Sequence, residues 1–351
     1  MSAVPQSLST PGDGGAVLEV VHQTRYAYSS PVSLAHHVAH LQPLEDGAQR
    51  LLDWQLHIEP PPAHLRASRD SLGNHQHHFE LQAPHAQLVV RSRSRVAVRP
   101  RFAALRAEAS PAWDTLAARL RYVARGPFVP ALEHALPSPY VPRLAALADF
   151  ARPSFVAGRP VAVVAIELMR RIHAGFVYES RATDVDTPLA RVLQQRRGVC
   201  QDFAHLLAGC LRAFGVPARY VSGYLLTRAP EDGTAMVGAD ASHAWVQVWC
   251  PGTPGVPAAG DATGDAAGDA PGDAAGDAAG DAAGSADDAW LDLDPTNDLV
   301  PASGHVRVAV GRDFGDVTPL RGVIRGGGRH DLQVGVHTRL LDAQELRRAN
   351  C

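Results

Sequence analysis

Residues 198–214 read GVCQDFAHLLAGCLRAF, and this stretch decides the fold of the chain. Apolar side chains recur along it at helical spacing and form one stripe, made of Phe203, Leu206, Leu207, Cys210, Leu211 and Phe214. Gly215-Val216-Pro217 follows and ends the helix. We therefore predict a helix over 199–214 that is buried along the stripe and carries the thiol of Cys200 in its first turn.

Strand patterns follow this helix at 218–226, 243–249 and 290–293. Between the second and the third, Gly recurs every fourth residue from Gly260 to Gly284, and eight Asp occur by Asp288 with no basic residue. Such a composition has nothing to bury in a core, so we predict a disordered acidic insertion. Two more strand patterns, at 306–310 and 331–339, either complete the same sheet or return to the N-terminal part.

The chain before the helix has two kinds of pattern. Residues 17–98 contain extended runs separated by turn residues such as Gly73-Asn74, which predicts an all-β sandwich. Between 112 and 174 apolar residues recur at helical spacing, and prolines from Pro127 to Pro142 divide the segment into separate helices. The predicted fold class is α+β. We divide the chain, in order, into a disordered N-terminus (1–15), the sandwich (16–100), a helical connection (101–150), a core (151–300) that holds the insertion (256–288), C-terminal strands (301–340) and a tail (341–351).

Composition excludes several classes of function. The 351 residues carry a formal charge of -3, which argues against nucleic-acid binding by the chain as a whole. The first residues contain no basic and apolar leader, and no apolar run approaches the roughly 20 residues that a membrane span needs. Four scattered cysteines do not form a disulfide framework. These features predict a cytoplasmic protein with neither nucleic-acid nor membrane partners.

Three polar residues in the predicted elements are arranged for chemistry. Main-chain N–H groups and the helix dipole stabilise a thiolate at the position of Cys200. His243 begins one strand and Asp294 ends the next, where Pro295 keeps it extended. Neighbouring strands lie about 4.8 Å apart, which is compatible with a hydrogen bond between imidazole and carboxylate. The order of cysteine, histidine and aspartate predicts a catalytic triad.

Four segments carry a family resemblance: 198–205 (GVCQDFAH), 217–224 (PARYVSGY), 242–246 (SHAWV) and 293–297 (LDPTN). They resemble the bacterial transglutaminase-like proteins of the papain-related superfamily. The segments 22–26, 70–74 and 306–313 resemble the β domain before that family's core and the segment after it. The resemblance implies a papain-like core without a cofactor, in which Cys200 is the nucleophile, His243 the base and Asp294 the orienting acid.

Supporting residues are predicted around this triad. The main-chain N–H of Cys200 is the natural first donor to an oxyanion. The superfamily adds a side-chain donor from upstream, for which Tyr178 and Gln194 are the candidates. Asp202 is expected to support the helix start, while Tyr224 and Trp245 either line the cleft or belong to the core.

Metal binding is the weaker interpretation of the polar residues. Cys200 and His205 are five residues apart on one helix, so their side chains diverge by well over about 100°, and no metal site is predicted. The group His75, His77 and His78 is ligand-like in composition, but it follows a turn. We interpret it as the solvated face of a hairpin.

The leading functional hypothesis is thiol-dependent hydrolysis of a peptide or protein carboxamide through a thioester. Proteins of the family are usually described as cysteine proteases, and unselective crosslinking inside a cell would be hazardous. A transglutaminase that passes the acyl group to an amine acceptor is the first alternative, because it uses the same triad. A non-catalytic binding module is the second.

Overall fold

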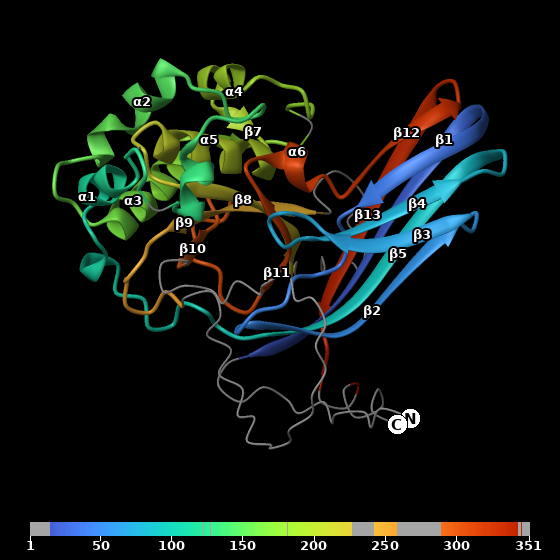
Figure 1. The fold of residues 1–351 in the computed structure, drawn as a ribbon, viewed down its shortest axis with the longest axis horizontal. Helices are drawn as coiled ribbons and strands as arrows, with labels where there is room; N and C mark the ends of the chain where they lie inside the picture. The colour runs from blue at the N-terminus through green and yellow to red at the C-terminus, as the bar shows by residue number, and fades with distance from the viewer. Residues whose placement is uncertain are drawn as a thin grey trace.

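The computed structural model describes residues 15–121, 123–126, 128–180, 182–226, 242–257, 289–342 and 345. The predictions for the N-terminus, the acidic insertion and the tail therefore fall almost wholly outside the described residues. The α+β class with antiparallel sheets is confirmed. In Figure 1 a four-stranded sheet lies between a group of helices and a second body made of long strands.

The strand-only body contains seven strands in one hydrogen-bonded sheet. Five come from the N-terminal part, and the last two come from the end of the chain. They are β1 (Ala16–Ala39), β2 (Gln49–Glu59), β3 (His64–Arg69), β4 (His75–Leu81), β5 (His85–Val98), β12 (Leu320–Gly326) and β13 (His330–Leu340). The strand pattern predicted at 331–339 thus returns to the N-terminal body, and so does β12, which was not predicted.

The long strand β1 belongs to both layers of this sandwich. Its first half pairs with β5 and β13, its register shifts between Ala27 and Val32, and its second half pairs with β4 and β12. Apolar side chains from the two layers share one core, with Leu88 of β5 on one side and Phe79 of β4 on the other. Each layer hides its apolar face against the other, which explains the alternating pattern in the sequence.

The histidine group of β4 does not behave as predicted. His78 is exposed, but His77 is buried and its ring lies 4.5 Å from the ring of Trp54. The interpretation as a solvated face was therefore wrong for His77. Alternation in a strand places His77 and His78 on opposite faces, and the second layer covers the face of His77.

The helices come from the middle of the chain. They are α1 (Trp113–Arg119), α2 (Ala145–Ala151), α3 (Val161–Gly175), α4 (Leu189–Gln195) and α5 (Cys200–Arg212), with 3-10 turns η1 (Ala107–Ala109), η2 (Pro130–Ala135) and η3 (Arg152–Ser154). The pair β6 (Val177–Tyr178) and β7 (Arg197–Gly198) is parallel. Part of the segment with predicted helical spacing is not helical, because α1 ends at Arg119 and Val123 after it is exposed.

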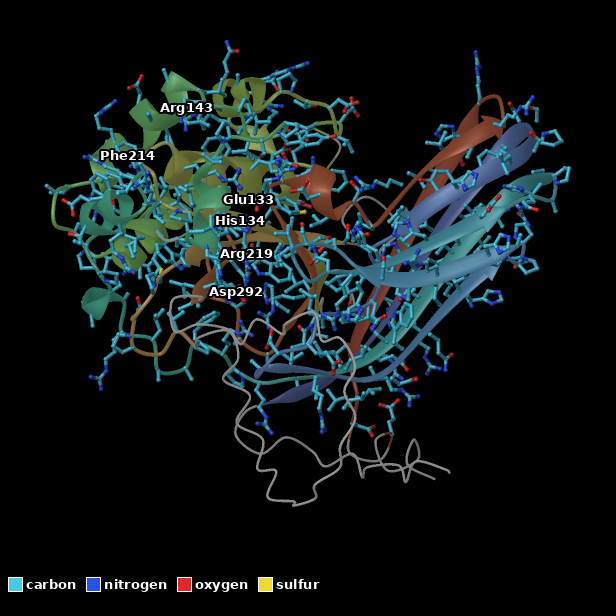
Figure 2. The ribbon with its side chains drawn as sticks, in the orientation of Figure 1. Glu133, His134, Arg143, Phe214, Arg219 and Asp292 are labelled. Atoms are coloured by element: carbon cyan, nitrogen blue, oxygen red, sulfur yellow. The ribbon has the colours of Figure 1, made fainter. Side chains whose placement is uncertain are left out.

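The core sheet has the order β10-β9-β8-β11 and is antiparallel throughout. Its strands are β8 (Ala218–Leu225), β9 (His243–Trp249), β10 (Trp290–Leu293) and β11 (His305–Gly311), followed by α6 (Phe314–Val317). Helix α5 packs on β8 and β9, and α2, α3 and α4 surround α5. At the β10 edge, the guanidinium of Arg219 and the ring of His134 both pack on Trp290, at the start of β10 (Figure 2).

The two bodies share a hydrophobic core. Leu18 and Val96 of the sandwich pack with Tyr224 of β8 and with Val306 and Val308 of β11. The hydroxyl of Tyr224 also lies 3.0 Å from Nδ1 of the buried His22. The sandwich is therefore packed directly against the sheet whose strand β9 carries His243.

Candidate active site

The thiol of Cys200 lies at the N-terminus of α5 and at the floor of a cleft of about 370 Å³. The residue is only 8% exposed, yet it lines the cleft. The other residues that line the cleft come from the 183–185 loop, from β8 and β9, and from the chain after β11: Thr183, Asp184, Val185, Val199, Gln201, Tyr220, Ser222, Ser242, His243, Ala244, Phe314 and Pro319. A substrate carbonyl can therefore approach the sulfur without any unfolding of the helix.

Asp202 fixes the start of this helix. Its Oδ2 accepts a hydrogen bond from the main-chain N of Val199 at 2.9 Å and another from the hydroxyl of Thr183 at 2.6 Å. A Cβ on Gly198 would lie 2.6 Å from the same oxygen, so only glycine leaves room for the carboxylate. The burial of Asp202 raises its pKa, and the two hydrogen bonds only partly oppose this. The glycine two residues before the nucleophile therefore makes room for the carboxylate of Asp202.

His243 and Asp294 are in direct contact. The strands β9 and β10 pair side by side, and Nε2 of His243 lies 2.7 Å from Oδ2 of Asp294. A carboxylate only accepts, so Nε2 carries the proton. Cys200 and His243 line the same cleft, and the Cys200 side chain contributes to the raised pKa of His243. Because Nε2 is on the carboxylate, Nδ1 is the nitrogen left for proton exchange in the cleft, and the structure brings the three predicted residues together around it.

Five donors surround the carboxylate of Asp294, which is fully buried. Oδ2 accepts from His243, from His305 Nε2 at 3.1 Å and from Asn297 Nδ2 at 2.6 Å. Oδ1 accepts from the main-chain N of Thr296 at 2.9 Å and from that of Asn297 at 3.2 Å. Burial alone would raise the pKa of Asp294, but the hydrogen bonds from the two histidines outweigh it and hold the pKa well below its usual range.

The contacts that lower the pKa of Asp294 raise the pKa of His243. Burial alone would lower the pKa of His243, since it disfavours the cation. The hydrogen bonds to Asp294 and Cys200 and the charges of both groups outweigh burial and raise that pKa to about 10. His243 is therefore an imidazolium at neutral pH, which can stabilise a neighbouring thiolate and donate a proton to a leaving group.

His305 was missed by the sequence analysis. It begins β11, its side chain is 5% exposed, and its ring lies 5.2 Å from the ring of Trp245. His305 stands at a strand start, as His243 does, so the same reasoning could have singled it out. What the sequence could not show is that β11 brings it onto the oxygen that His243 already contacts.

Three of these groups also have the composition of a metal site. The ligand atoms of His243, Asp294 and His305 lie within 4.8 Å of one another, the one such group found among the described residues. Two imidazoles and a carboxylate suit Zn²⁺. However, the hydrogen bonds described above already pair both Nε2 atoms with Asp294 Oδ2, and they account for the cluster without an ion.

The remaining predicted residues lie outside the cleft lining. Tyr178 is on β6 opposite Gly198, with its ring 6.3 Å from that of Phe203, and Gln194 is exposed on α4. Tyr224 belongs to the core shared with the sandwich, and Trp245 is fully buried behind His243. Tyr224 and Trp245 are therefore core aromatics, a correction to the cleft-lining alternative. The tyrosine that does line the cleft is Tyr220, which the sequence analysis did not single out.

The other described cysteines differ sharply from Cys200. Cys210 and Cys250 are fully buried. Burial raises the pKa of Cys210 to about 12 and raises that of Cys250 as well. A thiol that does not ionise near neutral pH is a poor nucleophile, so these two serve as core residues.

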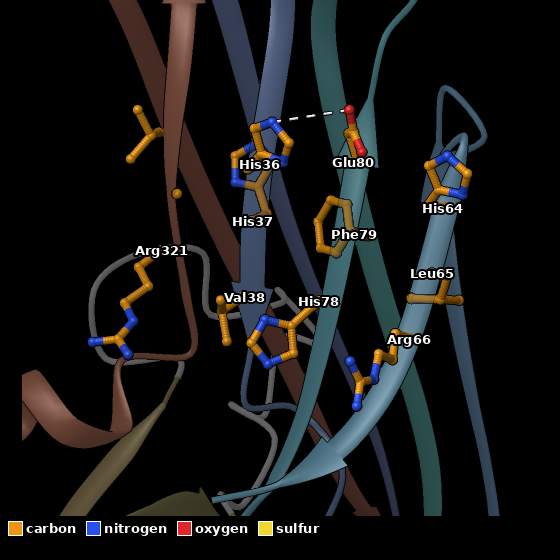
Figure 3. A pocket seen from close by; sticks show the side chains of 12 residues that line it. His36, His37, Val38, His64, Leu65, Arg66, His78, Phe79, Glu80 and Arg321 are labelled. Atoms are coloured by element: carbon orange, nitrogen blue, oxygen red, sulfur yellow. Dashed lines mark ion pairs between the residues drawn. The ribbon is translucent and has the colours of Figure 1, made fainter.

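A larger concave surface lies elsewhere, on the outer face of the sandwich (Figure 3). This groove of about 720 Å³ contains His36, His64, His78, Arg66 and Arg321, with Glu80 as its acid. It belongs to β1, β3, β4 and β12 and contains no residue of the cleft. We refer to it below as the histidine groove.

A helix-borne cysteine beside a histidine–carboxylate pair on an antiparallel sheet defines the papain-like class of folds. Residues 18–97 match the bacterial transglutaminase-like N-terminal region, and residues 158–258 match the transglutaminase-like superfamily. An uncharacterized protein of Mycobacterium tuberculosis is 36% identical over 318 residues, which cover 91% of this chain and 90% of that protein. The chain therefore belongs to the bacterial transglutaminase-like family.

Two further likenesses have narrower scope. A protein-glutamine gamma-glutamyltransferase of Pseudomonas aeruginosa is 37% identical over 113 residues, which is 31% of this chain and 17% of that protein. The crystal structure of "a Putative Cysteine Protease from Cytophaga hutchinsonii" has a TM-score of 0.63 and 18% identity, and covers 94% of this chain and 92% of that one. This structure shows a shared fold over almost the whole length. No helix of the described residues is long and apolar enough to cross a membrane.

Proposed function

We propose that this protein cleaves an amide bond with the thiol of Cys200 and hydrolyses the resulting thioester. The observation that carries the proposal is the hydrogen bond between His243 and Asp294 in the open cleft that Cys200 also lines. Family membership supports it, because transglutaminase-like proteins act on peptide or protein carboxamides. Cys200 is the proposed nucleophile, His243 the acid and base, and Asp294 the orienting acid.

The chemistry follows from the protonation states. The sulfur of Cys200 attacks the carbonyl carbon, and the carbonyl oxygen becomes an oxyanion. His243 gives its Nδ1 proton to the nitrogen as the C–N bond breaks, so ammonia or an amine leaves and a thioester remains. Water then attacks the thioester, His243 takes its proton, and the acid product leaves as the C–S bond breaks, which restores the thiolate beside the imidazolium. Asp294 stays ionised throughout and fixes the ring.

Donors to the oxyanion come from two places. The main-chain N–H of Cys200 at the helix start is the first. We propose the phenol of Tyr220 as the second, since it lines the cleft and packs on His205 of the same helix. Burial keeps the pKa of Tyr220 well above its usual value, so the hydroxyl stays a donor. Tyr178 and Gln194 remain weaker proposals, because neither lines the cleft.

Transfer to an amine is the second candidate. The glutamyltransferase of Pseudomonas aeruginosa matches the chain over 113 residues, which favours the same acyl chemistry with an amine as acceptor. Hydrolysis is the first proposal because water needs no second binding site. Hydrolysis also agrees with the name of the structural relative from Cytophaga hutchinsonii.

One experiment tests the activity and separates the two outcomes. A glutamine-containing peptide is incubated with the full chain, with and without a primary amine, and ammonia release and product masses are followed. Hydrolysis predicts the acid product even when the amine is present, and transfer predicts the amine adduct. The Cys200→Ala protein is the matched control, and ammonia release that persists in it would refute the assignment of the nucleophile. Failure of a panel of peptides, amides and isopeptides to acylate Cys200 would refute the proposed function.

A further inference from the structure

The outer edge of β11 is held by side-chain amides of the sandwich. Gln49 of β2 pairs with the main chain of Arg307 through two bonds: Arg307 N donates to Oε1 at 2.8 Å, and Nε2 donates to Arg307 O at 2.8 Å. Asn74 pairs with Val310 in the same way, at 2.8 and 2.7 Å. Both amides are buried. They replace a neighbouring strand at Arg307 and Val310, whose main-chain N–H and C=O groups are thereby hydrogen-bonded.

Charges reinforce the Gln49 end of this interface. Arg307 and Arg101 both form ion pairs with Asp46, which precedes β2. The guanidinium of Arg307 is almost fully buried, so the pair is little screened by solvent. The charge of Asp292 on β10 also acts on Arg307. The sandwich and both edge strands of the core sheet therefore meet around one arginine.

The first residue of β11 reaches the active site. His305 lies two residues before Arg307, so both side chains are on the same face of the strand. Its Nε2 donates to Asp294 Oδ2, the oxygen that also accepts from His243. A chain of contacts thus leads from Gln49 to the main chain of β11, then to His305, Asp294 and His243.

We infer that His305 is a positioning residue, through which the N-terminal sandwich holds the carboxylate of Asp294 in place for His243. The inference rests on the proposed function for its effect on catalysis, but its geometry is independent of the substrate. Thr296 and Asn297 already bond to the carboxylate, and His305 adds a second imidazole to Oδ2, the oxygen that His243 contacts. With a second imidazole on the same oxygen, Asp294 is held in one orientation, and so is the ring that faces Cys200.

Two amide substitutions of His305 provide a matched test. The amide nitrogen of Gln reaches about as far as Nε2 of His, whereas that of Asn ends near the position of Nδ1 and cannot reach Asp294. We expect His305→Asn to slow alkylation of Cys200 by iodoacetamide at pH 6.5 by about 10-fold, and His305→Gln to stay within about 3-fold of the native rate. Melting temperatures of the two variants show that both are folded.

A second readout does not depend on turnover. The ring ¹⁵N shifts of His243 report its protonation, which Asp294 and Cys200 favour; the ring of His305 lies 5.9 Å away. We expect the titration midpoint of His243 to fall in His305→Asn and to stay near the native value in His305→Gln. A shifted titration with no amide cleavage by the native protein would support the positioning role while the proposed function fails.

Substitution of the two sandwich amides that bond to β11, Gln49 and Asn74, extends the test to the sandwich. Gln49→Met and Asn74→Leu each remove two hydrogen bonds to β11, but Gln49 clamps the strand next to His305 and Asn74 clamps its far end. We expect Gln49→Met to slow alkylation by about 3-fold and Asn74→Leu to change it by less than about 2-fold. Equal rates and equal His243 titrations in His305→Asn and His305→Gln would overturn the inference. So would a Gln49→Met protein that reacts no more slowly than Asn74→Leu.

Discussion

Two regions of this molecule place imidazoles next to a single carboxylate, and they differ in almost every other respect. At the active site, His243 and His305 lie on Asp294, which is fully buried and accepts five hydrogen bonds. In the histidine groove, the strand register sets His36 and His64 on either side of Glu80. The nearest approach of Glu80 to His36 is 3.9 Å, and the His36 side chain is 60% exposed.

The difference shows that the residue types alone do not make an active site. The imidazoles and the carboxylate must also be buried and must contact one another. Water screens the charges in the groove, and an exposed pair of this kind contributes about 0–1 kcal/mol. At Asp294 the low-dielectric surroundings strengthen each contact, which raises the pKa of His243 to about 10. The groove is the larger hollow, but the cleft contains the nucleophile.

The largest expected effect separates the two regions by activity. His243→Ala removes the imidazole that Asp294 holds in place and that transfers a proton to the leaving amine. We therefore expect amide turnover to fall by about 10³-fold or more. His36→Ala in the groove is the matched control and should leave turnover within about 2-fold. Initial rates of ammonia release measure both. A comparable loss in the two variants would contradict the assignment of the site.

The carboxylates allow the same comparison with a smaller effect. Asp294→Asn keeps the size of the side chain but places an amide against two imidazole donors, and we expect turnover to fall by about 100-fold. Glu80→Gln should not change turnover measurably, because Glu80 touches nothing in the cleft. Should Asp294→Asn retain native turnover, the orienting role of the aspartate would have to be abandoned.

Protonation of His243 makes stability depend on pH. The folded-state pKa of about 10 lies above the ordinary value of 6.5, so the ion pair contributes its full stability below pH 6.5 and loses it as the pH rises through about 10. We expect the free energy of unfolding of the native protein, measured against His243→Gln, to fall between pH 7 and pH 10.5. Chemical denaturation at several pH values measures it.

The control for this titration lies in the groove. The free energy of unfolding of a His36→Gln protein should follow the native protein in parallel over the same range. A difference between native and His243→Gln that is constant from pH 7 to pH 10.5 would show that His243 is not held as an imidazolium by Asp294.

The smallest expected effects are those of the groove itself. His64→Ala and His78→Ala remove side chains on an open sheet face, so their free energies of unfolding should change by no more than about 0.5 kcal/mol. Differential scanning calorimetry is sufficient to compare them with the native protein. A loss of several degrees in melting temperature would mean that the groove is a structural element rather than an open surface.

Much of the site followed from the sequence because its residues stand at element boundaries. Cys200 begins a helix with a clear apolar stripe, and the predicted bounds of β9 and β10 agree with the structure. His305 was missed because its role depends on β11 lying beside β8, and such long-range pairing leaves no local pattern. Tyr220 and Tyr224 are on the same face of β8, and only the packing shows which one reaches the cleft.

The fold was predictable to a similar extent. Alternation indicated the sandwich but not that β1 serves both layers, since Pro31 can mark the register shift between Ala27 and Val32 but does not tell which strands pair on either side of it. The β12 sequence, LRGVIRG, was overlooked because two glycines weaken its strand pattern. The cytoplasmic location stays a prediction, as does the disorder predicted for the acidic insertion.

The most direct test of the central claim is the mass of the intact protein after rapid acid quenching with a cleavable amide or peptide substrate. The account predicts an acyl adduct on Cys200, equal to the substrate minus ammonia or the leaving amine, which is removed by hydroxylamine and is absent from His243→Ala. A native protein that cleaves the substrate without any such adduct, or that forms it equally well in His243→Ala, would contradict the account.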